Sequence, residues 1–276
     1  MRCLFGKRVH NKPTTMKTPC NCFRAIAKLR AALIYVLLLC SLPSFSQIKP
    51  VKNVVIVHGA FADGSGWKNV FNLLSVKGYQ VTVVQNPLTS LQDDVDATNR
   101  ILDKQDGPVI LVGHSWGGVV ISQAGLHKNV AALVYVAAYQ PDEGETTLKW
   151  ATSMPNLPEY GILPPDDKGF VYYDKAKFHA GFCADVPKEE AAFMFASQGP
   201  IFAESFATPL TQAAWRTKRA YGIVATQDKS IHPEVQRNMY NRSKTKITEI
   251  TGSHALFISQ PAAVADVIIA AATGNH

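Results

Sequence analysis

The stretch VILVGHSWGGVV (109–120) decides the fold. Four apolar residues are followed by a glycine-rich turn, after which the apolar run resumes. This pattern predicts a buried strand, a sharp turn and a buried helix. Within the turn, residues 113–117 read Gly-His-Ser-Trp-Gly and match G-x-S-x-G, in which a strained strand-to-helix turn presents the serine oxygen above a sheet. The sequence therefore favours Ser115 as a nucleophile over an ordinary tight turn.

Short segments rich in valine and isoleucine alternate with longer amphipathic segments on both sides of this turn. The alternation predicts a mostly parallel sheet covered by helices on both faces, an α/β fold. The expected strands are residues 53–59, 80–86, 108–113, 130–138, 220–228 and 245–251. The expected helices are residues 67–79, 90–105, 115–127 and 255–272.

Residues 140–210 interrupt this alternation. They are rich in proline and aromatic residues, and residues 187–206 are expected to be helical. Because the segment follows the fourth expected strand, we expect an inserted lid above the carboxyl ends of the strands, where open α/β sheets bind their ligands. The predicted organisation is one α/β domain over residues 47–276 with a lid at about 140–210.

The net charge of +7 does not indicate a nucleic-acid partner once the charges are located. Residues 1–46 contain eight lysines and arginines and no acidic residue, whereas the rest of the chain has 20 basic and 21 acidic residues. A domain with balanced charge lacks the basic surface that binds a polyanion. We therefore expect no nucleic-acid partner.

The basic N-terminal segment is followed by the apolar run AALIYVLLLC (31–40) and by SLPSFSQ (41–47). This is the layout of a secretory signal peptide over residues 1–46, with cleavage expected after Ser46. The apolar run is shorter than the ~20 residues of a membrane-spanning helix. We therefore expect an exported protein, periplasmic or secreted, with no stable membrane insertion after cleavage. An uncleaved anchor and a true start at Met16 are the alternatives.

A serine nucleophile needs a base and an acid that orients it, and in this hydrolase pattern the acid and then the histidine follow the serine. Asp228 lies just past an expected strand in YGIVATQDKSIHP. His254 lies in ITGSHALFISQP, in a loop before the last helix. Asp142 is the alternative acid, and His232 is the alternative base, although its place before a proline favours a helix start. We expect Asp228 and His254 to complete a triad with Ser115.

A tetrahedral oxyanion needs two N–H donors. The backbone N–H of Trp116 would lie at a helix N-terminus, where partial positive charge gathers. His58-Gly59-Ala60 ends the first expected strand, and Gly59 would let the Ala60 N–H face the serine. We expect these two N–H groups to form an oxyanion hole, and His58 and His114 to support their loops rather than to act as bases.

Metal and cofactor chemistry has no motif in this chain. HExxH and Cys/His clusters with ligand spacing are absent, and the glycine-rich GAFADGSG lacks the lysine of a phosphate-binding loop. Cys183 is the one cysteine outside residues 1–46, and its aromatic setting, KFHAGFC, is typical of a packed thiol. The sequence therefore predicts no cofactor, no metal and no internal disulfide.

The motifs VHGAF, VILVGHSWGG, ALVYVAAYQPDEGE, VATQDKSIHPEVQ and GSHALFISQP together support a family resemblance over residues 53–272. The chain resembles the α/β-hydrolase superfamily and, within it, the branch of plant methylesterases and hydroxynitrile lyases with their bacterial relatives. The resemblance implies an α/β-hydrolase fold with Ser115 as nucleophile, His254 as base and Asp228 as orienting acid. It likewise implies the N–H groups of Ala60 and Trp116 as oxyanion hole.

Two departures from that branch concern the lyases. They carry a lysine directly after the catalytic histidine, where this chain has Ala255, and a threonine in the loop after the first His-Gly, where Ser65 is the only hydroxyl. These departures disfavour cyanohydrin cleavage and leave the esterase interpretation intact, because an esterase needs only the triad and the oxyanion hole.

The sequence thus predicts a serine esterase that cleaves a small, apolar ester or lactone through an acyl-enzyme. The aromatic residues of the expected lid indicate an apolar pocket. A lyase or a cofactor-free peroxidase-type activity on the same triad is one alternative, and a ligand-binding protein that keeps the hydrolase fold is another. The physiological substrate and the oligomeric state are not specified by any of these motifs.

Overall fold

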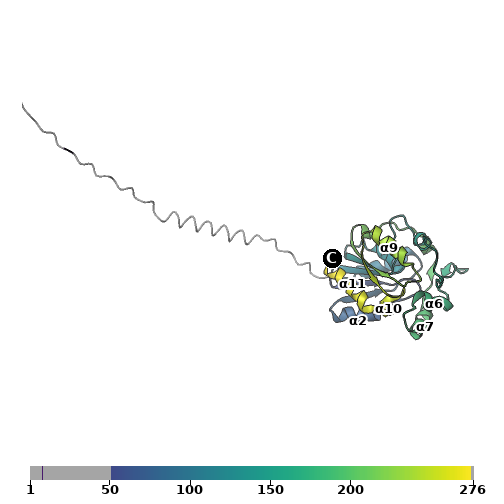
Figure 1. Cartoon of the computed structure of the whole chain (residues 1–276). Coiled ribbons are helices and arrows are strands. Elements are labelled where there is room, and N and C mark those ends of the chain that lie inside the picture. The colour runs from purple at the N-terminus through teal and green to yellow at the C-terminus, as the bar shows by residue number, and fades with distance from the viewer. Residues whose placement is uncertain (1–7, 9–50, 275–276) are drawn as a thin grey trace, which may run out of the picture. The chain divides into compact units, whose positions relative to one another are not determined.

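The computed structural model describes residues 51–274 and the single residue Arg8 (Figure 1). Its centre is a six-stranded sheet in the order β2-β1-β3-β4-β7-β8, in which every pairing is parallel. The strands are β1 (Asn53–Val57), β2 (Gln80–Val84), β3 (Val109–His114), β4 (Val130–Val136), β7 (Arg219–Ala225) and β8 (Lys246–Ile250). All six expected strands are confirmed, and the sheet is wholly rather than mostly parallel. The predicted signal peptide, its cleavage after Ser46 and the alternative start at Met16 lie outside the described residues.

Helices cover both faces of the sheet. They are α2 (Lys68–Val76), α3 (Leu91–Leu102), α4 (Gly117–Ala124), α9 (Pro233–Arg242), α10 (Leu256–Ser259) and α11 (Pro261–Thr273). Crossover connections between parallel strands are right-handed. Helix α2 leads from β1 to β2 at one edge of the sheet, whereas α3, α4 and α9 lead towards the opposite edge at β8. The two sets of helices therefore cover opposite faces. In agreement, α2 packs against α11 whereas α3 packs against α4, and Figure 1 shows α2, α10 and α11 together with α9 apart from them.

All four expected helices are present but with different boundaries, and two of the differences follow from a proline and a glycine. The C-terminal helix expected over residues 255–272 is divided at Gln260 into α10 and α11, because Pro261 has no N–H to continue the first helix and instead opens the second. The helix expected over residues 67–79 begins with a short 3-10 turn (Gly64–Trp67) and ends at Val76, before Gly78 takes a φ of +78°.

The segment between β4 and β7 contains the predicted lid, called here the insertion (residues 140–210). Its elements are α5 (Thr147–Ala151), β5 (Phe170–Val171), α6 (Lys175–Phe182), α7 (Lys188–Ala196), β6 (Ile201–Phe202) and α8 (Glu204–Ala207), and a 3-10 turn (Ala214–Arg216) follows it. The prediction of helix throughout residues 187–206 is wrong. Helix α7 ends at Ala196, and β6 then pairs antiparallel with β5, because Pro200 cannot donate a helical hydrogen bond.

The buried centre of the sheet fixes where the site can lie. Every residue of β1 and β3 is buried, so these strands and the start of α4 form a close-packed unit. A Cβ on Gly117 would lie 2.4 Å from the Val57 carbonyl oxygen, and one on Gly118 would lie 2.2 Å from that of Tyr139. The two glycines thus let α4 begin directly against the ends of the neighbouring strands.

Candidate active site

Ser115 occupies the turn between β3 and α4. Its φ is +52°, in the left-handed region that residues with a side chain rarely adopt. The chain that follows β1 also passes close to Ser115, since a Cβ on Gly59 would lie 2.7 Å from the Ser115 Cβ. The steric strain that the motif predicts at this serine is therefore present, and local strain of this kind gathers at functional sites.

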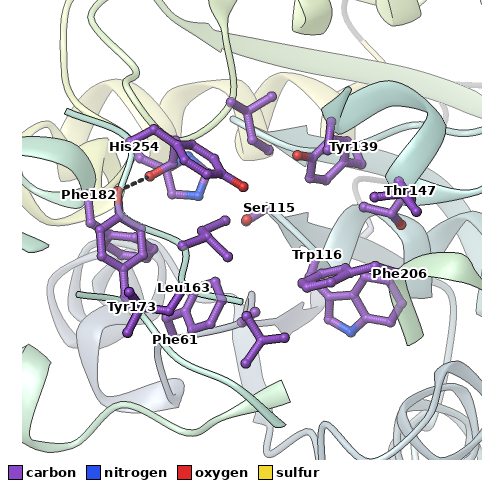
Figure 2. Close-up of a pocket in the computed structure, with 18 of the residues that line it drawn as sticks. Phe61, Ser115, Trp116, Tyr139, Thr147, Leu163, Tyr173, Phe182, Phe206 and His254 are labelled. Atoms are coloured by element: carbon purple, nitrogen blue, oxygen red, sulfur yellow. Dashed lines mark hydrogen bonds between the residues drawn. The ribbon is translucent and has the colours of Figure 1, made fainter. Parts of the chain in front are cut away.

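His254 and Asp228 form a buried pair. The His254 Nδ1 donates to the Asp228 Oδ2 at 2.7 Å, and each residue is 1% exposed. Asp228 follows β7, and His254 lies between β8 and α10, so residues 26 positions apart meet at adjacent strand ends. His254 and Ser115 line the same cavity, on which both converge in Figure 2. The structure thus brings together all three residues of the expected triad.

Three further donors hold the Asp228 carboxylate. The backbone N–H groups of Ser230 and Ile231 each donate to Oδ1 at 2.8 Å, and the Gln236 side-chain amide donates to Oδ2 at 2.8 Å. A carboxylate that accepts several hydrogen bonds is fixed in orientation and favoured in its charged form. Sequence reasoning missed Gln236, whose place in α9, eight residues after Asp228, was the one available signal.

The alternative acid and base lie elsewhere. Asp142 accepts two hydrogen bonds from the Arg216 guanidinium, which lowers the pKa of its carboxyl group. His232 caps α9, where its Nδ1 accepts from the Glu234 N–H. Neither residue lines the cavity of Ser115. Their local partners account for them as structural residues.

His114 and His58 support the site from below. The His114 Nε2 donates to the backbone oxygen of His254 at 2.9 Å, and burial lowers its pKa well below the usual range, so the ring is neutral. The His58 Nδ1 donates to the Gly59 oxygen while its Nε2 accepts from the Asn86 N–H, and burial lowers its pKa as well. Both rings act as loop supports, and His114 additionally holds the loop that carries His254.

Trp116 has two separate environments. Its indole N–H donates to the Asp94 Oδ2 at 2.7 Å, and its ring meets Phe206 edge-on at 5.6 Å between centroids. Asp94 is fully buried on α3, and desolvation raises the pKa of its carboxyl group to about 6, although the bonds from Trp116 and from the Leu88 N–H oppose the rise. The sequence leaves open whether the indole lines the pocket or packs beneath it, and the structure shows that it lines the cavity.

The backbone N–H groups of Ala60 and Trp116 have no hydrogen-bond acceptor within residues 51–274. Both residues line the cavity beside Ser115, and neither N–H donates to another described residue. Buried N–H groups are almost always paired. Two unpaired donors beside a strained serine are therefore available to an oxygen atom of a bound ligand.

The cavity itself is apolar and has a volume of about 280 Å³. Most of its wall comes from the insertion, including Ile162 and Val171. Figure 2 labels four further wall residues of the insertion that contribute apolar surface, Leu163, Tyr173, Phe182 and Phe206. No lysine, arginine, aspartate or glutamate is among the lining residues. An uncharged ligand suits this cavity, because transfer of an unpaired charge into such surroundings is unfavourable.

Asp185 ties the insertion to the loop of His254. Its carboxylate accepts from the Ser253 N–H at 2.9 Å, from the Ser253 hydroxyl and from the Ser259 hydroxyl at 2.7 Å. These bonds lower the pKa of the Asp185 carboxyl group despite its partial burial. In addition, the Ala255 N–H donates to the Phe182 oxygen. Sequence reasoning missed Asp185, because no motif links residue 185 to residue 253.

Cys183 is fully buried, and burial raises the pKa of its thiol to about 12, so it stays protonated. The described part of the chain contains no group of three or more histidine, cysteine, aspartate or glutamate residues arranged to hold a metal ion. In the same part, none of the helices has the length and apolar character needed to cross a bilayer.

Comparisons with known proteins agree with the family resemblance seen in the sequence. A profile described as the Alpha/beta hydrolase family matches residues 54–267. The chain is 26% identical to a pyrethroid hydrolase from Sphingobium wenxiniae, over 79% of this chain and 86% of that protein. It is 27% identical to salicylic acid-binding protein 2 from Nicotiana tabacum, over 78% of this chain and 94% of that protein. Plant methylesterases are among the other similar proteins, in agreement with the predicted branch.

A solved structure extends the comparison to the fold. The crystal structure of a pyrethroid hydrolase from Sphingobium faniae superposes with a TM-score of 0.68 at 23% identity. The superposition covers 82% of this chain and 98% of the other. The α/β-hydrolase fold expected from the sequence is thereby confirmed.

Proposed function

We propose, from the premise that this chain belongs to the alpha/beta hydrolase family, that it is a serine hydrolase of small, apolar carboxylic esters or lactones. The observation that carries the proposal is the buried His254–Asp228 pair in contact with a cavity that also exposes Ser115. The similarity to a pyrethroid hydrolase and to plant methylesterases supports ester hydrolysis. The absence of a lysine after His254 favours hydrolysis over cyanohydrin cleavage, since Ala255 holds that position.

The first half of the reaction would acylate Ser115. Its Oγ attacks the ester carbonyl while His254 Nε2 takes the proton, since Nδ1 is held by Asp228. The carbonyl oxygen becomes an oxyanion and accepts from the free N–H groups of Ala60 and Trp116. As the tetrahedral intermediate collapses, His254 returns the proton to the alkoxy oxygen and the alcohol leaves.

The second half would hydrolyse the acyl-enzyme. His254 takes a proton from a water molecule, whose oxygen attacks the acyl carbonyl, and the same two N–H groups stabilise the second oxyanion. Collapse releases the acid and returns the proton to Ser115 Oγ. Throughout, the negative Asp228 stabilises the positive charge on the His254 ring, and its own three donors keep it in place.

The cavity supports the substrate class. A volume of about 280 Å³ lies at the small end of typical ligand pockets, and its aromatic wall would contact the acyl and alcohol groups through apolar surface. Its lack of charged lining residues favours uncharged esters.

Replacement of Ser115 by alanine tests the function. Hydrolysis of short p-nitrophenyl esters should fall by a factor of about 10⁵ or more, because no nucleophile remains, while circular dichroism stays that of the native protein. A fluorophosphonate probe should label the native protein at Ser115 and leave the variant unlabelled. Unchanged turnover in S115A would contradict the mechanism, and a folded native protein that resists labelling would favour a ligand-binding role instead.

We also propose that the protein is exported. The basic segment, apolar run and small residues before Gln47 support this. N-terminal sequencing of protein recovered from the periplasm or medium should begin at Gln47, and recovery of uncleaved chain in the cytoplasm would contradict it.

A further inference from the structure

The hydroxyl of Tyr139 stands out among the polar groups of the cavity. Tyr139 is 7% exposed and lines the cavity, yet its phenolic oxygen has no hydrogen-bond partner among the described residues. In Figure 2 the hydroxyl points toward the part of the cavity that holds Ser115 and His254. Buried tyrosine hydroxyls usually find a partner, so this one is available to a ligand.

The remaining hydroxyls of the cavity wall are less available. Ser230 Oγ donates to the Gly181 oxygen and is also within hydrogen-bond distance of the Tyr173 hydroxyl, so these two groups already have partners. Thr147 Oγ1 lacks a partner but is enclosed by protein atoms. Tyr160 is more exposed than Tyr139 and comes from a loop of the insertion. Apart from the reacting groups, Tyr139 is therefore the residue with a free hydroxyl that a strand end, rather than the insertion, presents to the cavity.

The backbone fixes Tyr139 relative to the nucleophile. The Tyr139 N–H donates to the Ser115 oxygen at 3.2 Å, and its own carbonyl oxygen lies against Gly118 at the start of α4. A hydroxyl carried by this rigid strand end keeps its distance from Ser115 without any movement of the insertion. Such a group can select between substrates by the position of one oxygen atom.

Esters are complementary to a donor. A simple ester has oxygen acceptors and no donor, and its carbonyl oxygen would be taken by the Ala60 and Trp116 N–H groups in the proposed reaction. Burial raises the pKa of the Tyr139 phenol, so it stays protonated and able to donate. A second oxygen on the substrate would therefore be the natural partner of this hydroxyl.

We propose that Tyr139 is a specificity-determining residue whose hydroxyl donates to a second oxygen of the substrate, so that the preferred substrates are uncharged esters with an additional ketone or ether oxygen. This inference rests on the proposed esterase function and adds to it one substrate feature, a neutral acceptor near the scissile ester. The rest of the cavity wall contacts the apolar parts of the same molecule.

The test compares matched esters on matched variants. Methyl hexanoate is compared with its 3-oxo, 4-oxo and 5-oxo derivatives, which differ from it by one carbonyl oxygen. In the native protein at least one oxo ester should show a KM about 5-fold lower than that of methyl hexanoate, as one net hydrogen bond provides. Tyr139→Phe should abolish that preference, so that the ratio of the KM of methyl hexanoate to the KM of the best oxo ester falls to about one. Tyr172→Phe, at an exposed tyrosine outside the cavity wall, serves as the control and should retain the preference.

Binding to an inactive variant separates this inference from the proposed function. In the Ser115→Ala background, the Kd of the best oxo ester, measured by tryptophan fluorescence, should rise about 5-fold when Tyr139→Phe is added. Hydrolysis of methyl hexanoate with no oxo preference, or with a preference that Y139F retains, would overturn the inference and leave the esterase standing. Absence of all hydrolysis with the binding difference intact would overturn the esterase and retain the subsite.

Discussion

The strand ends and the insertion line the same cavity but are held in place by different interactions. At the strand ends, backbone meets backbone: Ser115 N–H donates to the Val136 oxygen, and Ala137 N–H donates to the Ile223 oxygen. In the insertion, backbone bonds such as that from the Leu163 N–H to the Tyr172 oxygen are joined by side-chain bonds, as where the Asp166 carboxylate accepts two N–H groups of one turn. The first arrangement depends little on side-chain identity, whereas the second adds bonds that depend on it.

The strand ends carry the groups that would react, whereas the insertion provides most of the surface that would contact the substrate. The groups that would react lie just beyond the ends of the sheet strands, where packing leaves them one position. The insertion surrounds the substrate with an aromatic cluster, in which Tyr173, Phe178 and Phe182 lie 5.0–5.7 Å apart between ring centroids. Substitutions there can reshape the cavity without displacing Ser115. Apart from Tyr139, changes at the strand ends should therefore act on kcat, and changes in the insertion away from Asp185 should act on KM.

Replacement of Asp228 by asparagine should give the largest effect among changes that retain the nucleophile. Asparagine would have one oxygen to accept from His254 and the three other donors, and it could not stabilise the positive ring, so kcat should fall by about 10³–10⁴. Steady-state kinetics on p-nitrophenyl esters measures it. Asp142→Asn is the control, because Asp142 pairs with Arg216 away from the cavity and should leave kcat unchanged. A larger loss in D142N than in D228N would reverse the assignment of the acid.

Asp185 tests the point where the two regions meet. Asp185→Ala should lower kcat on the order of 10-fold with a native circular dichroism spectrum. The reason is that Ser253 and Ser259, which lie on either side of His254, lose their hydrogen bonds to the insertion. The control Asp166→Ala removes the bonds of a turn inside the insertion and should act on KM and on thermal stability rather than on kcat. Equal effects on kcat from both variants would mean that the insertion and the strand ends are not separable.

The parts that the sequence predicts and the parts it misses follow the same division. The positions of the strands along the chain, the sharp turn at Ser115 and the meeting of Asp228 with His254 follow from local patterns, because parallel strands bring their carboxyl ends to one edge. The helix expected over residues 187–206 is interrupted by β6 between α7 and α8, since short elements of the insertion are set by tertiary contacts rather than by periodicity.

The supporting residues could not be found from the sequence for a related reason. Gln236 bonds to Asp228, Asp185 bonds to Ser253 and Ser259, and Asp94 bonds to Trp116, over separations of 8 to 74 positions. No periodic pattern marks such bonds. Their residue types are also common on exposed surfaces. Only the packing of the elements shows that these polar side chains are buried or partly buried beside the site.

Asp94 should give the smallest effect on activity and a measurable effect on stability. Its pKa, raised to about 6 by burial, lies above the unfolded value of 3.8, so the folded state binds more protons between these two values. Asp94 therefore contributes stability that is complete below pH 3.8 and is lost as the pH rises through 6. Asparagine does not titrate, so its contribution to stability does not change with pH. It can accept only one of the two bonds from Trp116 and Leu88, which lowers the stability of the variant equally at every pH. The free energy of unfolding of D94N minus that of the native protein should thus rise between pH 4 and pH 7.

Urea unfolding at several pH values measures that difference, and the neighbouring residue supplies a control of opposite sign. Hydrogen bonds from Ser90 and Thr89 lower the pKa of exposed Asp93, so its contribution is present above pH 3.8 and is lost on acidification. The D93N difference should therefore not rise with pH. A flat D94N difference would mean that Asp94 titrates as an exposed carboxylate does, in which case its bond to the Trp116 indole would not be part of a buried support for the strand ends.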